Sequence, residues 1–440
     1  MLTLVSLVVV ISLIVFFTIK FHLHPFLTLL LAAIVMGFIG GLNTGTILST
    51  VTEGFGNTLK SIGIIIACGT IIGTFLERSG GAKTMAALVL KIVGEKRAPL
   101  AMSLTGFIVS IPVFCDSGFV ILSALNRALS RRTGRSLAVL AVALSTGLYT
   151  THVFVPPTPG PLAAAATIGA DIGLIIILGL IVSLPTAGVG LLWALVYSKR
   201  FRIIPKEFLE SENNTQVKPN TGLSFAPIIV PIIFISLKSI ADYPTAPLGS
   251  GIAKSMFGFI GHPVIALIIG VFLAFALKKK KMNGTNFDWV AAGLKNAGSI
   301  ILITGAGGAF GTVLRATGVG DIAGHTMAQW HLGIFLPFII AAVLKTAQGS
   351  STVAIITTAA LVSPLLAPMG LSAPIAKALV VLAIGAGAMT ISHVNDSYFW
   401  VVAQFSEMDT GTAIRCHSMA TLWQGLVSII TIMFLKIILI

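Results

Sequence analysis

The chain has 440 residues, of which 56% are hydrophobic and only 10% are charged, and its mean hydropathy is +1.01. Soluble domains average about a quarter charged residues, so this composition excludes an ordinary soluble protein and indicates a polytopic membrane protein. The net charge of +14 does not predict a nucleic-acid partner, because an excess of Lys and Arg is typical of cytoplasmic loops in membrane proteins. The three cysteines have no paired spacing, which argues against a disulfide framework or a zinc site. We expect no cofactor.

The first apolar run, Leu2–Ile19, lacks a basic leader and a cleavage site, so we expect a retained span and not a signal peptide. A span needs about 20 apolar residues. The segments that meet this requirement are 2–19, 25–42, 59–76, 137–153, 172–198, 224–240, 256–277, 291–314, 375–391 and 418–440. The basic residues between them fall on one side if the first span runs inward. This pattern predicts that both termini face outward.

Residues 98–130 do not fit as a simple span. The region follows Lys96 and Arg97 and ends among further arginines up to Arg135, so both flanks should be cytoplasmic. Each apolar arm is too short for a full crossing, and the turn falls at Cys115–Gly118. Irregular backbone at membrane depth is tolerated only inside protein or beside a water-filled cavity. The region therefore predicts a re-entrant hairpin.

A second hairpin is expected at residues 332–366, where two short apolar arms meet at Ala347–Thr352. The alternation of the spans makes it enter from the opposite face. Two helices are also expected to be broken within the membrane. The helix at 137–169 is interrupted by the prolines of Val155–Pro161, and the helix at 374–405 by the polar run Ser392–Ser397.

The two halves of the chain resemble each other. Gly69–Gly80 aligns with Gly307–Gly318, Ser117 with Ser350, and Thr151–Val153 with Ser392–Val394, in the same order and at nearly constant offset. We therefore predict two repeats, 1–198 and 223–440, joined by a cytoplasmic linker at 199–222. The charge pattern gives them opposite orientations, and inverted repeats are a common plan of secondary transporters. The predicted fold is an all-α polytopic membrane protein with two inverted-topology repeats, each containing a re-entrant hairpin and a broken transmembrane helix.

Only two acidic residues are expected at membrane depth, Asp116 in the first hairpin tip and Asp396 in the second break. Intramembrane carboxylates indicate function by default, although each could serve only as a helix cap. His152 and His393 occupy matching places in the two breaks. They could titrate near neutral pH, donate to a substrate hydroxyl, or only orient the backbone.

The hairpin tips also supply hydroxyls and amides. Ser117, Gly118, Ser350, Ser351 and Thr352 form this set, which suits a carboxylate substrate. Thr158 and Asn395 add polar groups at the two breaks. These groups, together with His152, are the predicted substrate contacts, and Asp116, Asp396 and His393 are the candidates for coupling to a proton.

Four segments resemble the gluconate permease family of proton symporters, within the ion transporter superfamily. They are Phe114–Leu122, Pro156–Pro161, Gly349–Thr357 and Ser392–Trp400. The resemblance covers essentially the whole chain. It implies proton-driven uptake of aldonates and related hydroxy acids at a site formed by hairpins and broken helices, in a homodimer of the bacterial inner membrane. The chain departs from better-known members at Asp116-Ser117, where they carry Glu-Val, and at Thr158, where they often carry His.

These patterns predict a secondary active transporter, not an enzyme. The expected activity is proton-coupled uptake of a small hydroxylated monocarboxylate such as gluconate. A sodium-coupled carboxylate carrier and a transporter of D-serine or glycerate remain alternatives, and a membrane-embedded hydrolase or a passive channel fits the repeat less well.

Overall fold

The computed structural model describes residues 23–205, 219–241, 251–279, 282, 284–318, 332–393 and 396–440. The predicted first span, most of the linker and Asn395 lie outside this part of the chain. Within it, the regular structure is entirely helical. Five helices are long and apolar enough to cross a membrane, or up to seven when two bent pairs are each counted as one span. The predicted all-α polytopic membrane fold is confirmed.

The first half of the chain contributes eight helices to the described part. They are α2 (Pro25–Ile39), α3 (Thr44–Arg78), α4 (Gly81–Val93), α5 (Ala98–Val109), α6 (Cys115–Thr133), α7 (Leu137–Phe154), α8 (Pro159–Ile168) and α9 (Ile172–Val196). The α3 helix begins well before the expected residue 59. The Asn43 side chain accepts a hydrogen bond from the Thr46 amide at 2.9 Å, and this N-cap extends the helix through a polar stretch that hydropathy does not detect.

The second half follows with α10 (Thr221–Ala241), α11 (Ile252–Ile260), α12 (Pro263–Phe275), α13 (Asn286–Ala316), α15 (Phe335–Gln348), α16 (Ser351–Val362), α17 (Pro374–Met389), α18 (Ser397–Phe405), α19 (Thr410–Ala413) and α20 (Met419–Leu439). A five-residue π-helix, Ile414–Ser418, precedes α20. The expected span 256–277 is present as two helices that together are long and apolar enough to cross a membrane, but it is not straight. It is bent by 62° between α11 and α12, because Pro263 cannot donate an amide hydrogen to the preceding turn.

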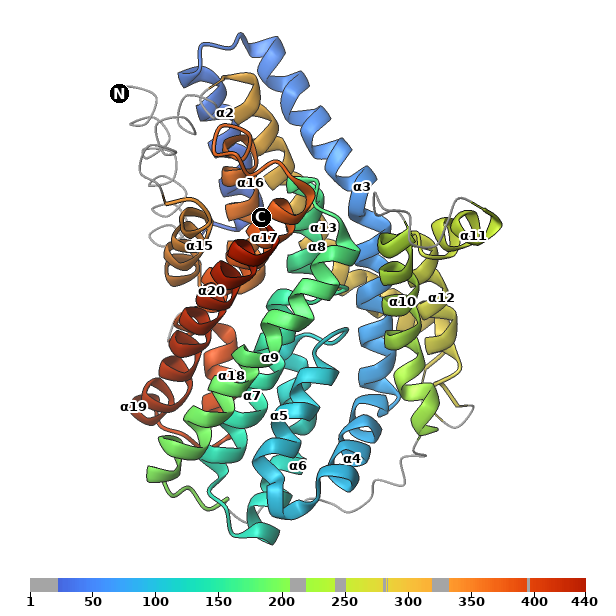
Figure 1. Ribbon diagram of the computed structural model, residues 1–440, viewed down its shortest axis with the longest axis vertical. Coiled ribbons are helices and arrows are strands. Elements are labelled where there is room, and N and C mark those ends of the chain that lie inside the picture. The colour runs from blue at the N-terminus through green and yellow to red at the C-terminus, as the bar shows by residue number, and fades with distance from the viewer. Residues whose placement is uncertain are drawn as a thin grey trace.

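The helix pairs α5–α6 and α15–α16 lie at opposite ends of the molecule (Figure 1). The α5–α6 pair turns at residues 110–114, and the α15–α16 pair turns at Gly349, whose φ of 72° is readily adopted by glycine. Between them, α7–α8 and α17–α18 are each interrupted by a short non-helical segment. Two paired helices and two interrupted helices are thus present, but the first pair does not turn at the expected Cys115–Gly118. Those residues form the first turn of α6, and the turn lies before them, where Pro112 cannot continue a helix. The re-entrant character of the pairs and the inverted relation of the two halves stay predictions.

Glycine contacts allow the central helices to pack closely. A Cβ atom added to Gly147 on α7 would lie 2.2 Å from the Ser103 carbonyl oxygen on α5. Small residues commonly permit such close approach of membrane helices. Residues 137–165, which include α7 and most of α8, are all buried in the molecule, so the first break is held inside protein.

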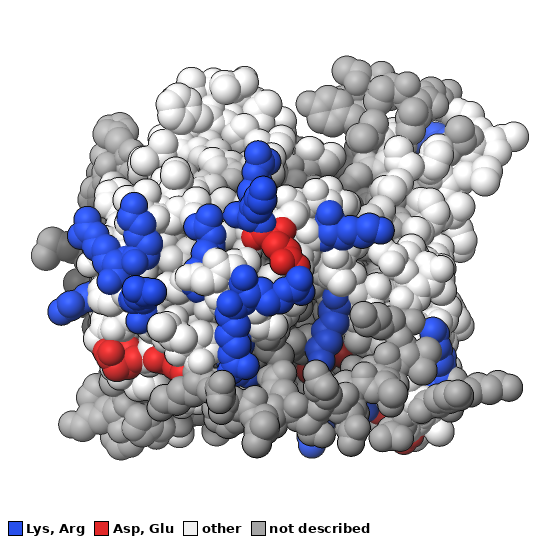
Figure 2. Space-filling model, turned by 90° about the horizontal axis from the view of Figure 1, so that it is seen from below, with Lys and Arg blue, Asp and Glu red and all other residues white. Residues whose placement is uncertain are grey.

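One end of the molecule carries many Lys and Arg side chains (Figure 2). The connections from α4 to α5 and from α6 to α7 lie at this end in Figure 1, and there Arg132 forms an ion pair with Glu95 at 2.8 Å. The concentration of positive charge agrees with the expected cytoplasmic face. Which side the termini face remains a prediction.

Candidate functional site

The first turn of α6 and the start of α18 meet at a pair of polar residues. The Ser397 hydroxyl donates to the Asp116 carboxylate at 3.4 Å, across 281 positions of the chain. Asp116 lies in the first turn of α6, whose N-cap is Phe114, and no side chain caps that helix. Asp116 therefore does not act as a simple cap. Its half-buried carboxylate is directed to the other half of the chain.

Asp396 forms a buried ion pair with Lys345 on α15. Only 1% of the lysine side chain and 4% of the aspartate side chain are exposed. The Ser392 hydroxyl donates to the same carboxylate oxygen at 2.5 Å, and the Tyr398 amide donates to the other oxygen at 3.1 Å. Asp396 is thus the N-cap of α18 and also the counter-ion of a buried cation.

Lys345 is a site residue that the sequence reasoning missed. Its ammonium group also donates to the Gly349 carbonyl at 3.3 Å, at the turn into α16. The signal was present, because Lys345 is a lone cation in an otherwise apolar arm next to the expected hairpin tip. An intramembrane lysine indicates a functional site by the same physical argument as an intramembrane acid.

Two tyrosines form an aromatic wall beside the ion pair. The Lys345 ammonium lies 6.0 Å from the centre of the Tyr149 ring, and this ring lies 5.1 Å from that of Tyr398. The Tyr398 hydroxyl donates to the Ser145 carbonyl at 2.9 Å, and the Ser145 hydroxyl lies 3.2 Å from a ring nitrogen of His417. The hydrogen bond anchors Tyr398, and the two packed rings form one boundary of the site.

The second hairpin tip places its hydroxyls at the start of α16. Ser350 is the N-cap and accepts from the Val353 amide at 3.4 Å. Ser351 is buried and Thr352 is half-buried. The first amides of a helix have no partner in the preceding turn, so this end of α16 can donate to an anion.

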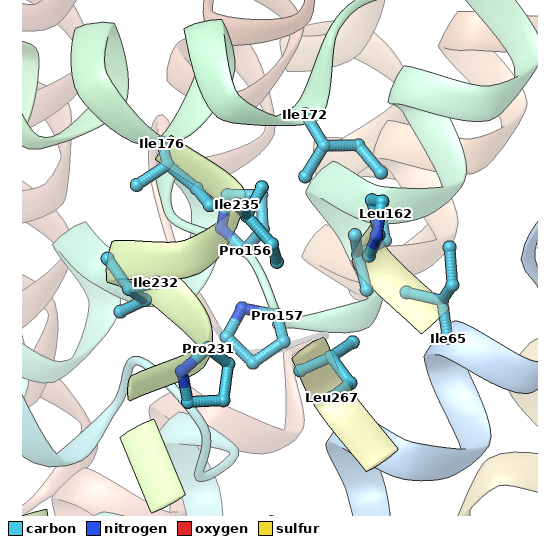
Figure 3. A pocket seen from close by; sticks show the side chains of 11 residues that line it. Ile65, Pro156, Pro157, Leu162, Ile172, Ile176, Pro231, Ile232, Ile235 and Leu267 are labelled. Atoms are coloured by element: carbon cyan, nitrogen blue, oxygen red, sulfur yellow. The ribbon is translucent and has the colours of Figure 1, made fainter. Parts of the chain in front are cut away.

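The first break, between α7 and α8, has mainly apolar surroundings. The Thr158 hydroxyl donates to the Val155 carbonyl at 2.8 Å and is buried. Pro157 next to it faces an apolar pocket between α3, α9, α10 and α12, opposite Pro231 (Figure 3). No polar side chain lines this pocket. It therefore suits helix packing and not a hydroxy acid.

The remaining predicted contacts lie in different local surroundings. His152 is buried beside Phe114, at 5.9 Å between ring centres, and its Nδ1 has no partner among the described residues. His393 is half-buried, and its carbonyl accepts from the Asp396 amide at 2.8 Å. Ser117 is half-buried beside Asp116. Asn395 lies outside the described residues.

Gly118 differs from the expectation. Its amide donates to the Phe114 carbonyl at 2.8 Å within α6, and an added Cβ would lie 2.7 Å from the Leu148 side chain. The amide is already satisfied and the α-carbon faces a neighbouring helix. Gly118 therefore serves close packing of α6 on α7, and we withdraw it from the substrate contacts.

The architecture defines a class. Helical hairpins and broken helices meet around buried charges in a polytopic membrane protein, and the described part of the chain holds no cluster of three metal-ligating residues. Such interrupted helices around a buried polar site are typical of secondary transporters. The YdaH transporter of Alcanivorax borkumensis has the same overall fold, with a TM-score of 0.69 at 16% identity over 94% of this chain and 99% of that one.

The family follows from comparison of sequences. A model of the GntP family permeases matches residues 2–438, and the chain belongs to this family. It is 35% identical to the gluconate permease of Pseudomonas aeruginosa over 99% of this chain and 97% of that protein. It is 32% identical to the D-serine transporter DsdX of Escherichia coli, over 96% of each chain. The protein is a transporter and not an enzyme.

Proposed function

We propose that the protein is a proton-coupled symporter that takes up a small hydroxylated monocarboxylate, with gluconate as the lead substrate, across the bacterial inner membrane. The observation that carries the proposal is the buried Lys345–Asp396 pair beside Asp116. A cation suits the carboxylate of the substrate, and acids that sit at membrane depth suit a proton. The gluconate-named relative supports the choice of substrate.

The proposed roles follow the positions of the groups. The hydroxyls of Ser117, Ser350, Ser351 and Thr352 and the first amides of α16 face the substrate. Asn395 and His152 contact substrate hydroxyls. Asp116 and Asp396 are the proton sites, with His393 beside them. Thr158 supports the break through its bond to Val155. The termini face outward, and the working unit is a homodimer.

The test is uptake of labelled gluconate into proteoliposomes that contain the purified protein. We expect accumulation when the outside is acidic, and loss of accumulation when a protonophore collapses the gradient. Unlabelled D-serine and glycerate serve as competitors that rank the substrates. Accumulation driven by a sodium gradient at constant pH, with no response to protons, would contradict proton coupling and favour the sodium-coupled alternative.

A further inference from the structure

The stability of the fold does not by itself explain why Lys345 and Asp396 are charged. Both side chains are almost fully removed from solvent, and buried ion pairs contribute little net stability compared with apolar residues of similar size. Each charge is nevertheless costly when its partner is removed. Neither residue can therefore change partner unless another charge arrives at the same moment.

The neighbourhood offers a place for that second charge. The Lys345 ammonium contacts the Gly349 carbonyl at the turn into α16, so it lies close to the first amides of this helix. Ser350 and Thr352 at the same turn are half-buried, and Ser397 next to Asp396 is exposed. The buried pair thus has neighbours along the chain, Ser350, Thr352 and Ser397, that are polar and partly or fully accessible to solvent.

From this arrangement we infer that Lys345 is the group that binds the substrate carboxylate, and that it does so by exchanging Asp396 for the substrate. The inference rests on the proposed function and deepens it. In the resting state Asp396 neutralises Lys345. A proton from the water on the entry side binds the Asp396 carboxylate, an O–H bond forms, and the ion pair is released. The substrate carboxylate then takes the freed position against the ammonium and the α16 amides.

The exchange keeps the charge of the site constant. One proton and one monovalent anion enter together, and the sum of charges on Lys345, Asp396 and the substrate is unchanged. The hydrogen bonds also remain satisfied. Ser392 donates to the ionised carboxylate, and because a hydroxyl can donate or accept, it can accept from the protonated acid. The second oxygen keeps its bond from the Tyr398 amide.

Other titratable groups surround Asp396. Asp116 is the other acid near the pair, and the remaining titratable groups within electrostatic range are Cys115 on α6, Tyr149 and His152 on α7, Tyr398 on α18 and His417 in the π-helix. Among the described residues, Lys345 forms an ion pair with Asp396 and not with Asp116, whose carboxylate contacts Ser397 and Cys115. The exchange is therefore assigned to Asp396.

The decisive measurement is proton uptake on substrate binding. Calorimetric titration of the purified protein with gluconate, in buffers of different ionisation enthalpy, gives the number of protons bound with each substrate. We expect about one proton in the wild type at a pH where the pair is ionised. Asp396→Asn mimics the protonated state, so it should still bind gluconate but take up no proton. It should exchange labelled for unlabelled gluconate across a membrane without accumulating it.

The second measurement tests the cation. The neutral amide of gluconate has nearly the same shape but no carboxylate. We expect the wild type to prefer the acid over the amide by at least about 100-fold, since a buried charge without its partner is strongly disfavoured. Lys345→Gln should bring this ratio close to one. The matched control is Lys91→Gln, at an exposed position on α4, which should leave both the ratio and the proton count unchanged.

The double variant Lys345→Gln with Asp396→Asn carries no buried charge of the pair, so it provides a folded reference if either single variant fails to fold. It should bind acid and amide alike and take up no proton. Proton uptake that persists in Asp396→Asn but disappears in Asp116→Asn would overturn the exchange in favour of Asp116. Retained discrimination in Lys345→Gln would overturn the role of the lysine. Failure of the wild type to bind any hydroxylated monocarboxylate would instead refute the proposed function.

Discussion

Replacement of Lys345 alone should destabilise the protein strongly. Lys345→Met removes the cation and leaves a carboxylate of which only 4% is exposed. Breaking a buried pair costs about 3–5 kcal/mol. Asp396 keeps its bonds from Ser392 and the Tyr398 amide, which stabilise the charge, so we expect the lower end, about 3 kcal/mol of unfolding free energy.

A double-mutant cycle separates the pair from its surroundings. In Lys345→Met with Asp396→Asn both charges are gone, and Asn keeps an oxygen that can accept from the Tyr398 amide. Such neutral replacements of buried pairs are often close to neutral in stability, so we expect the double variant within about 1 kcal/mol of the wild type and a coupling of about 2 kcal/mol or more.

The assay is unfolding in mixed detergent micelles, followed by tryptophan fluorescence at fixed pH. The control Lys91→Met changes an exposed lysine on α4 and should shift the unfolding free energy by no more than about 0.5 kcal/mol. A Lys345→Met variant as stable as this control, or a double variant that loses the sum of both single losses, would refute the view that these charges depend on each other.

Three further predictions concern the frame around the site. Gly147→Ala should lower the unfolding free energy by about 1–3 kcal/mol, because the added methyl group forces α5 and α7 apart. The control Gly188→Ala, where a Cβ atom meets nothing within 4 Å, should be neutral or slightly stabilising. Thermal unfolding of the two variants makes the comparison. Gln424→Leu should lose about 1–3 kcal/mol in the same assay, because it leaves hydroxyl and carbonyl partners on α7 and α9 without their donor. The Thr412 amide holds the pKa of Asp409 below its ordinary value, so this cap stabilises the folded state above the unfolded pKa and is lost as the pH falls through the lowered one. Hydrogen exchange at Thr412, corrected for intrinsic rates, should accelerate below about pH 4 in the wild type and not in an Asp409→Asn variant.

The first break was predictable from the sequence because proline acts locally. The α7 helix ends at Phe154, directly before the run from Val155 to Pro161, and α8 begins at Pro159. The flanking arginines of α6 were likewise a local signal. A composition that is apolar over short arms and polar at their junctions therefore predicts helices and their interruptions well.

The exact residue at which α17 ends could not be predicted from the sequence. The α17 helix ends at Met389, and Ile391 adopts a φ of 56°, a conformation that is unfavourable for a β-branched residue. Tertiary contacts hold it, since the Ser392 amide donates to the Thr421 hydroxyl on α20 at 2.9 Å. The partner of Lys345 was hidden for the same reason. It lies 51 positions away, and only the folded chain brings the two charges together.

The contact between Asp116 and Ser397 has a consequence for biosynthesis. These residues are 281 positions apart. Ribosomes add about 5–20 residues per second, so α6 waits about 15–60 s in the membrane before α18 exists. During that interval Asp116 lacks its hydroxyl donor, and the Ser145 carbonyl lacks the Tyr398 hydroxyl that later binds it. The first half must therefore be inserted as an incomplete intermediate with polar groups still open, and the last quarter of the chain closes the site.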